Sequence, residues 1–112
     1  MLYACIAIFA LAAMAGLTIL ISWLKKKNAP RAVVYTHGLL AASALVLLAV
    51  FSYNNPESFP KYSLIFFVLA ALGGFYMFAR DMKGKSSPIA LAGLHALLAV
   101  GGFVMLLIFA FS

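Results

Sequence analysis

The sequence predicts an all-α integral membrane protein: a four-transmembrane up-down-up-down helix bundle built from two parallel repeats of a helical hairpin. Three observations support this fold class. Of 112 residues, 67% are hydrophobic, 8 are Lys or Arg and 2 are Asp or Glu. A soluble domain of this size could not bury so much apolar surface. The chain also contains four long apolar runs, and it matches itself without a gap at a shift of 58 residues.

The four apolar runs have about 18–24 residues each, enough to cross a hydrocarbon core of roughly 30 Å as helices. None of them contains Asp, Glu, Lys or Arg. The runs are Leu2–Leu24, Ala32–Tyr53, Tyr62–Ala79 and Pro88–Phe111. They use nearly the whole chain, so we expect residues 1–112 to form a single transmembrane domain without a soluble part.

The first run is expected to be a permanent span. It lacks the basic region that opens a cleavable signal peptide, and the repeat makes it half of the first hairpin. Its residue Cys5 is the only cysteine of the chain. Cys5 therefore forms no internal disulfide, and we expect it to fill space as a small apolar residue.

The second and fourth runs begin alike. Pro30 and Pro88 stand where each helix should start, a position that tolerates a missing N–H group. Asn28 and the Ser86–Ser87 pair precede them and have side chains that commonly cap helices. The loop between the second and third runs contains two prolines and is expected to be a plain connector.

The internal repeat pairs residues 1–54 with residues 59–112, and 16 of 54 aligned positions are identical. The best-matched segments are Leu11–Gly16 over Leu69–Gly74 and Pro30–Ala41 over Pro88–Ala99. Equivalent runs are two crossings apart, so the two hairpins should be parallel copies. We expect them to be related by a pseudo-twofold axis along the membrane normal.

The basic residues are unevenly distributed between the loops. All but Lys61 flank the first and third loops: Lys25, Lys26, Lys27, Arg31, Arg80, Lys83 and Lys85. The positive-inside rule makes that side cytoplasmic. We therefore expect a multi-pass protein of the cell inner (cytoplasmic) membrane with both termini outside the cytoplasm. The net charge of +6 could suggest a nucleic acid partner, but this distribution of the basic residues favours the lipid bilayer. Contact with anionic lipids would be a secondary role of the same residues.

His37 and His95 are the only histidines, and the repeat places them at equivalent positions. Each lies seven residues past a proline, about 10 Å along its helix. Histidines within a membrane are costly and indicate a functional site. Their shared depth, on helices that lie on one diagonal of the bundle, is the geometry of two axial ligands on one metal.

The helical faces around the two histidines carry small residues. They are Val34, Ala41 and Ala44 beside His37, and Ala92, Ala99 and Gly102 beside His95. A flat macrocycle between two helices would need such space, and close helix packing would use it equally well.

Two hydroxyl-bearing residues should lie level with the histidines on the preceding helices, namely Thr18 with His37 and Tyr76 with His95. A hydroxyl beside an imidazole N–H could fix the tautomer of the ring. Alternatively, the imidazole could bond a backbone carbonyl one turn back, near Val33 or Leu91, and the hydroxyls could bond their own helix. Gly16 and Gly74 lie nearby and could let a ring edge approach.

Two histidines are too few for a zinc site, which takes three or four protein ligands. Haem b fits better, because its porphyrin supplies four nitrogens and the protein supplies two axial groups. We therefore predict one haem b held by His37 and His95. Its propionates could reach basic or hydroxyl side chains near the cytoplasmic surface, namely Arg31, Arg80, Lys27, Lys85 and Tyr35.

With four helices, paired histidines on a diagonal and basic cytoplasmic loops, the chain resembles small b-type membrane cytochromes such as the bis-histidine bundles of the cytochrome b561 class. This resemblance covers the chain in outline and implies one-electron transfer through a six-coordinate haem b. Members of that class often carry two haems, whereas two histidines here allow one per chain.

Other functions remain open. The histidines could serve a haem-free structural or interaction subunit, or a quinone- or metal-binding membrane protein. No nucleophile–base pair, phosphate-binding glycine loop or carboxylate pair points to an enzyme. Small multidrug transporters are of similar size, but their coupling needs a membrane-buried carboxylate, and Glu57 and Asp81 both lie at loops. A single haem in one leaflet would need a quinone, another redox protein or a second copy of the chain, as in a homodimer, to pass electrons onward.

Overall fold

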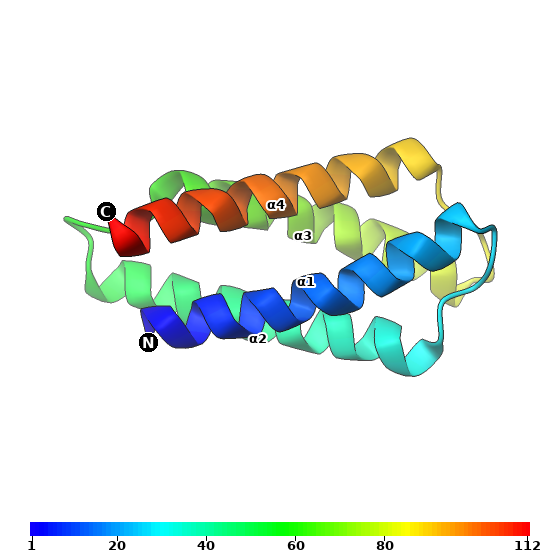
Figure 1. Ribbon diagram of the computed structural model, residues 1–112, viewed down its shortest axis with the longest axis horizontal. Coiled ribbons are helices and arrows are strands. Elements are labelled where there is room, and N and C mark those ends of the chain that lie inside the picture. Colours follow the sequence, from blue (N-terminus) through cyan, green and yellow to red (C-terminus); the bar gives the residue numbers. More distant parts are fainter. The chain divides into compact units, whose positions relative to one another are not determined.

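The computed structural model describes residues 1–112 and contains four α-helices (Figure 1). They are α1 (Leu2–Leu24), α2 (Arg31–Asn54), α3 (Lys61–Met82) and α4 (Ile89–Phe111). Each helix is long and apolar enough to span a membrane, with mean hydropathies from 1.9 to 2.6. The chain is therefore all-helical and compatible with a multi-pass membrane protein, as the apolar runs predicted.

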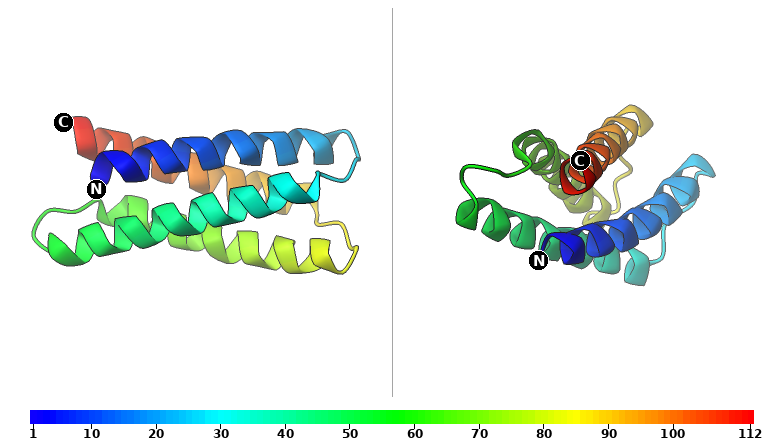
Figure 2. Two further views of the ribbon diagram at one scale, coloured as in Figure 1. Left: turned by 90° about the horizontal axis from the view of Figure 1, so that it is seen from below. Right: turned by 60° about the vertical axis from the view of Figure 1, so that its left-hand side comes forward.

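The helices pack in two sequential pairs. α1 lies along α2 and α3 lies along α4, as the right-hand view of Figure 2 also shows. The chain divides into two compact units, Met1–Phe59 and Pro60–Ser112. Each unit is one helical hairpin closed by a short turn.

The buried residues of the helices, except Ser52 of α2 and Ala92 of α4, fall at equivalent positions of the two hairpins. In α1 and α3 the equivalent buried pairs are Cys5 and Ser63, Phe9 and Phe67, Ala12 and Ala70, and Ile19 and Met77. In α2 and α4 they are Ala44 and Gly102, and Leu48 and Leu106. Cys5 is fully buried. The partners of each pair are 58 residues apart, so the spacing of the sequence repeat recurs in the buried positions.

Each hairpin turns through the same backbone conformation. Lys26 has φ of 57° and its equivalent Gly84 has φ of 71°. The next residue donates its N–H back to the carbonyl five residues earlier, Lys27 to Ser22 and Lys85 to Arg80, at 2.9 Å in both cases. This bond and the left-handed residue before it form a Schellman motif, which satisfies carbonyls at the end of a helix.

The starts of α2 and α4 differ in detail from the prediction. Pro30 and Pro88 are the N-cap residues themselves, and neither helix has a side-chain cap hydrogen bond. The expected caps from Asn28 and from Ser86–Ser87 are therefore wrong, because these residues precede the cap position. The carbonyls of Pro30 and Pro88 still accept the first helical hydrogen bonds.

Candidate functional site

In the first hairpin, the imidazole of His37 reaches across from α2 to the backbone of α1. Its Nδ1 lies 2.8 Å from the carbonyl oxygen of Ala12, and the side chain is half-buried. A carbonyl only accepts, so Nδ1 must donate its hydrogen in this bond. In the neutral ring the lone pair available to a metal then belongs to Nε2.

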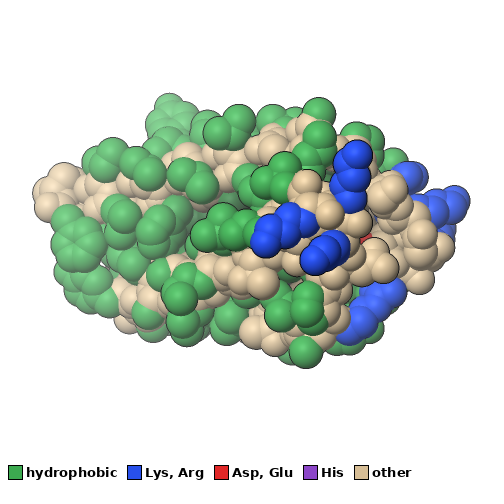
Figure 3. Space-filling model, turned by 45° about the vertical axis from the view of Figure 1, so that its right-hand side comes forward, with side chains coloured by type: hydrophobic (Ala, Val, Ile, Leu, Met, Phe, Trp, Pro, Cys, Tyr) green, Lys and Arg blue, Asp and Glu red, His purple; other side chains and the backbone are tan.

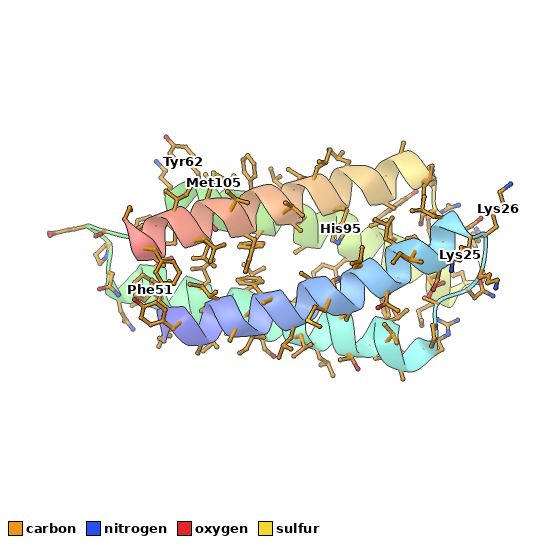
Figure 4. All side chains as sticks on the ribbon, in the orientation of Figure 1. Lys25, Lys26, Phe51, Tyr62, His95 and Met105 are labelled. Carbon is orange, nitrogen blue, oxygen red and sulfur yellow. The ribbon has the colours of Figure 1, made fainter.

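The second hairpin repeats this bond. Nδ1 of His95 lies 2.7 Å from the carbonyl oxygen of Ala70, and the imidazole extends from α4 toward α3 (Figure 4). In both hairpins the histidine follows its acceptor by 25 residues. The two imidazoles therefore share one tautomer, one acceptor type and one position in the repeat.

A glycine lies against each imidazole. A Cβ atom added to Gly16 would come within 2.9 Å of Cε1 of His37, and one added to Gly74 would come within 3.1 Å of Cε1 of His95. In an α-helix the carbonyl of one residue points toward the residue four positions later. A side chain at residue 16 or 74 would thus cover the carbonyl that the imidazole uses. The pairs Ala12–Gly16 and Ala70–Gly74 are small-x-x-x-small spacings that allow close approach.

Some of the small residues near the histidines lie in the contact between the two helices of a hairpin. Ala44 is fully buried. Gly102 is buried, and a Cβ added to it would lie 3.3 Å from side-chain atoms of Phe66 and Phe67 on α3 of the same hairpin. Ala41 and Ala99, one turn after each histidine, are half-buried. The part of the small-residue face at Ala44 and Gly102 therefore serves packing within the hairpins.

Thr18 and Tyr76 have other partners than the imidazoles. The hydroxyl of Thr18 donates to the carbonyl of Met14, 3.2 Å away on its own helix. Tyr76 is 55% exposed, and its ring lies 6.0 Å from the guanidinium carbon of Arg80. The orienting group that each Nδ1 uses is instead a backbone carbonyl, on the neighbouring helix and not one turn back near Val33 or Leu91.

The sequence does contain a signal for this acceptor, because Gly16 and Gly74 were expected to let a ring edge approach and each lies against its imidazole. Every residue has a carbonyl, so no residue type marks an acceptor directly. The repeated glycines do mark it, because Gly16 and Gly74 each precede a histidine by 21 residues and uncover the carbonyl one turn earlier.

The cations expected near a propionate differ in their surroundings. Arg31 is exposed at the first residue of α2, six residues before His37. Arg80 is half-buried and donates from Nη2 to the carbonyl of Ser86 at 2.7 Å, with Nε at 3.3 Å from the same oxygen. Arg80 therefore holds the second turn, and Arg31 is the arginine that is exposed.

The structure contains no group of three or more His, Cys, Asp or Glu side chains placed to hold an ion. A macrocycle that brings its own nitrogens needs only the two imidazoles. Comparisons of the chain with protein-family models, with curated proteins and with solved structures gave no match.

Proposed function

We propose that this chain is a b-type cytochrome-like membrane protein that binds one haem b through His37 and His95 and transfers single electrons. The observation that carries the proposal is the repeated imidazole environment. Each histidine donates from Nδ1 to a helix carbonyl and lies against a glycine of the preceding helix. Because the two histidines have the same tautomer and the same type of hydrogen-bond acceptor, they suit the role of two equivalent ligands of one iron.

The chemistry of the imidazoles fits this role. A metal-bound histidine commonly donates its other ring N–H to a carbonyl or carboxylate, which fixes the tautomer and makes the ligating nitrogen more basic. In both hairpins the donating nitrogen is Nδ1, so Nε2 would bind the iron. Ala41 and Ala99 would flank the macrocycle, and Arg31 and Lys27 would offer cations to its propionates. Thr18 and Tyr76 are no longer needed to orient the rings.

A bound haem held by His37 and His95 would supply a one-electron couple. The residues of the chain would bind the cofactor, hold the two imidazole tautomers and exclude water with apolar side chains. Electron transfer through one haem in one leaflet requires a partner, and we propose a quinone, another redox protein or a second copy of this chain.

The proposed site implies an arrangement in the membrane. We propose the inner (cytoplasmic) membrane, with the two basic turns on the cytoplasmic side and both termini outside the cytoplasm. The distribution of Lys and Arg supports this orientation. An up-down-up-down bundle of two parallel hairpins, related by a pseudo-twofold axis, would then place both histidines in the cytoplasmic leaflet.

An optical spectrum of the protein, purified after expression with excess haem, tests the proposal. We expect the Soret band and sharp α-band of a low-spin haem, at one haem per chain. His37→Gly and His95→Gly should each abolish the low-spin spectrum and weaken haem retention. Added imidazole should restore low-spin features in either variant, which separates loss of a ligand from loss of fold.

A haem-free structural role is the second candidate, because the Nδ1–carbonyl bonds join the two helices of each hairpin. Hydrogen bonds between membrane helices contribute about 0.6–2 kcal/mol. On this alternative, the purified protein would have no Soret band, and both histidine variants would only lower thermal stability. A haem that survives loss of both histidines would show that other groups ligate it.

A further inference from the structure

The first hairpin has a shallow groove on its surface that the haem proposal does not use. The groove has a volume of about 310 Å³ and lies open between α1 and α2. It is lined by Met14, Ala15 and Thr18 of α1 and by Ala32, Val33 and Thr36 of α2. The volume is at the lower end of the range for ligand sites, about 300–1,000 Å³. An open apolar groove suits one chain of a lipid better than a compact molecule.

Two threonines line this groove, one on each helix. The repeat places Tyr76 and Leu94 of the second hairpin at the positions of Thr18 and Thr36, where the side chains are therefore larger. The threonine hydroxyls donate to carbonyls of their own helices, Thr18 to Met14 at 3.2 Å and Thr36 to Ala32 at 2.7 Å. Their methyl groups can therefore face an apolar occupant.

The groove leads toward the basic turn of the same hairpin. At 1.5 Å per residue, Thr18 lies about 9 Å and Met14 about 15 Å before the end of α1 at Leu24. Ser22 and Lys25 follow Thr18 at four and seven positions, which continues the same helical face. An occupant of the groove would thus have its polar end near Lys25.

The charge of this turn is strongly positive. Lys25, Lys26 and Lys27 are all exposed, and exposed Arg31 begins the next helix. The acidic residue of this hairpin, Glu57, follows the far end of α2. Figure 4 labels Lys25 and Lys26 at the end of α1, and Figure 3 shows Lys and Arg side chains in blue, apart from most of the hydrophobic side chains of the visible face.

The second turn differs from the first. The last turn of α3 before it contains Asp81, and Arg80 of the same helix donates to the carbonyl of Ser86. The second turn also has Gly84 in the left-handed conformation that the first turn imposes on Lys26. A lysine in that conformation is strained, and strained residues cluster at binding sites. The first turn thus keeps a third positive charge where the second accepts glycine.

We propose that the first hairpin binds one anionic phospholipid. Its phosphate lies at Lys25–Lys27 and Arg31, and one acyl chain lies in the groove between α1 and α2. The charge of the turn selects an anionic headgroup over a zwitterionic one, and the groove on the same face selects a lipid over a soluble anion. Lys27 and Arg31 are also the cations proposed for the haem propionates, whereas Lys25, Lys26 and the groove belong to the lipid proposal alone.

Native mass spectrometry of the full chain in detergent, titrated with phosphatidylglycerol or phosphatidylcholine of identical acyl chains, tests it. Wild type should bind one phosphatidylglycerol at least tenfold more tightly than phosphatidylcholine. Lys25→Gln with Lys27→Gln should weaken phosphatidylglycerol binding about 25-fold, since each cation near an anionic lipid is worth about fivefold. The matched control, Lys83→Gln with Lys85→Gln in the second turn, should change it less than twofold.

The groove is tested by giving it the residues of the other hairpin. Thr18→Tyr with Thr36→Leu should weaken binding of both lipids at least tenfold, while helix content and monodispersity stay unchanged. Glycerol 3-phosphate at millimolar concentration should not displace the lipid. The proposal would be overturned if the two lipids bound with equal affinity, or if the two pairs of lysine variants lost equal affinity for phosphatidylglycerol. It would also be overturned if glycerol 3-phosphate displaced the lipid, or if the protein with the filled groove bound lipid as wild type does.

Discussion

At the scale of residues, an absent side chain decides where each imidazole lies. Gly16 and Gly74 let the ring of the next helix reach a carbonyl that a side chain would cover. The equivalent positions of His37 and His95 within their own hairpins could be predicted, because they follow from the 58-residue spacing alone. Their acceptor was expected to be a hydroxyl or a carbonyl one turn back, since sequence spacing along one helix does not show how closely two helices approach.

Alanine at the two glycines should have graded effects. Alanine normally stabilises a helix relative to glycine by about 0.5–1 kcal/mol, and Gly38→Ala should show this gain because nothing lies within 4 Å of its added Cβ. Gly16→Ala should instead lose about 1–3 kcal/mol by overpacking, with its Cβ 2.9 Å from Cε1 of His37. Gly74→Ala, at 3.1 Å from His95, should fall between them.

Thermal unfolding in detergent measures these differences, with Gly38→Ala as the control. If haem is bound, the low-spin spectrum should shift in the same order, because the imidazole that moves is also the ligand. A Gly16→Ala protein as stable as Gly38→Ala would show that His37 does not lie against α1.

At the scale of elements, hydropathy predicted the helices well because each span must be apolar over its whole length. α1 begins and ends as the first apolar run does, and α4 begins one residue later than the fourth run. α3 continues three residues past Ala79, through Arg80 and Asp81. Charged residues end an apolar run without ending a helix, since backbone hydrogen bonds continue into the headgroup region.

The two turns provide a matched test of left-handed backbone conformation. Lys26 and Gly84 both have positive φ, which costs a residue with a side chain about 1–2 kcal/mol. Glycine adds entropy to the unfolded chain, about 0.4–1 kcal/mol. Lys26→Gly should therefore stabilise the protein by about 0.5–1 kcal/mol, and Gly84→Lys should destabilise it by a similar amount.

These two stability changes can be checked by measuring the unfolding midpoints of each single variant and of the double variant. The double variant should return close to wild type, because the two turns belong to different hairpins. A loss of stability in Lys26→Gly would mean that the lysine side chain contributes contacts that outweigh the backbone strain.

At the scale of the whole molecule, the repeat relates two hairpins that are each complete. Each contains its own seam, turn, histidine and orienting carbonyl. Those parts depend on neighbours in one hairpin, so local spacing could predict most of them. The sharing of one haem by His37 and His95 involves both hairpins and stays a prediction of the repeat, together with the pseudo-twofold axis.

The orientation of the molecule should follow its charge asymmetry. The basic residues other than Lys61 flank the two short turns, and the positive-inside rule predicts that those turns lie in the cytoplasm. A reporter fused after Ser112 should therefore be active only if it works outside the cytoplasm, such as alkaline phosphatase. Fusions truncated at Lys27 should show the opposite preference and serve as the internal control. If a fluorescent protein fused after Ser112 became fluorescent in the cytoplasm, the orientation would be the opposite of the one proposed. Arg31 would then face outward, and the proposed haem would lie in the outer leaflet.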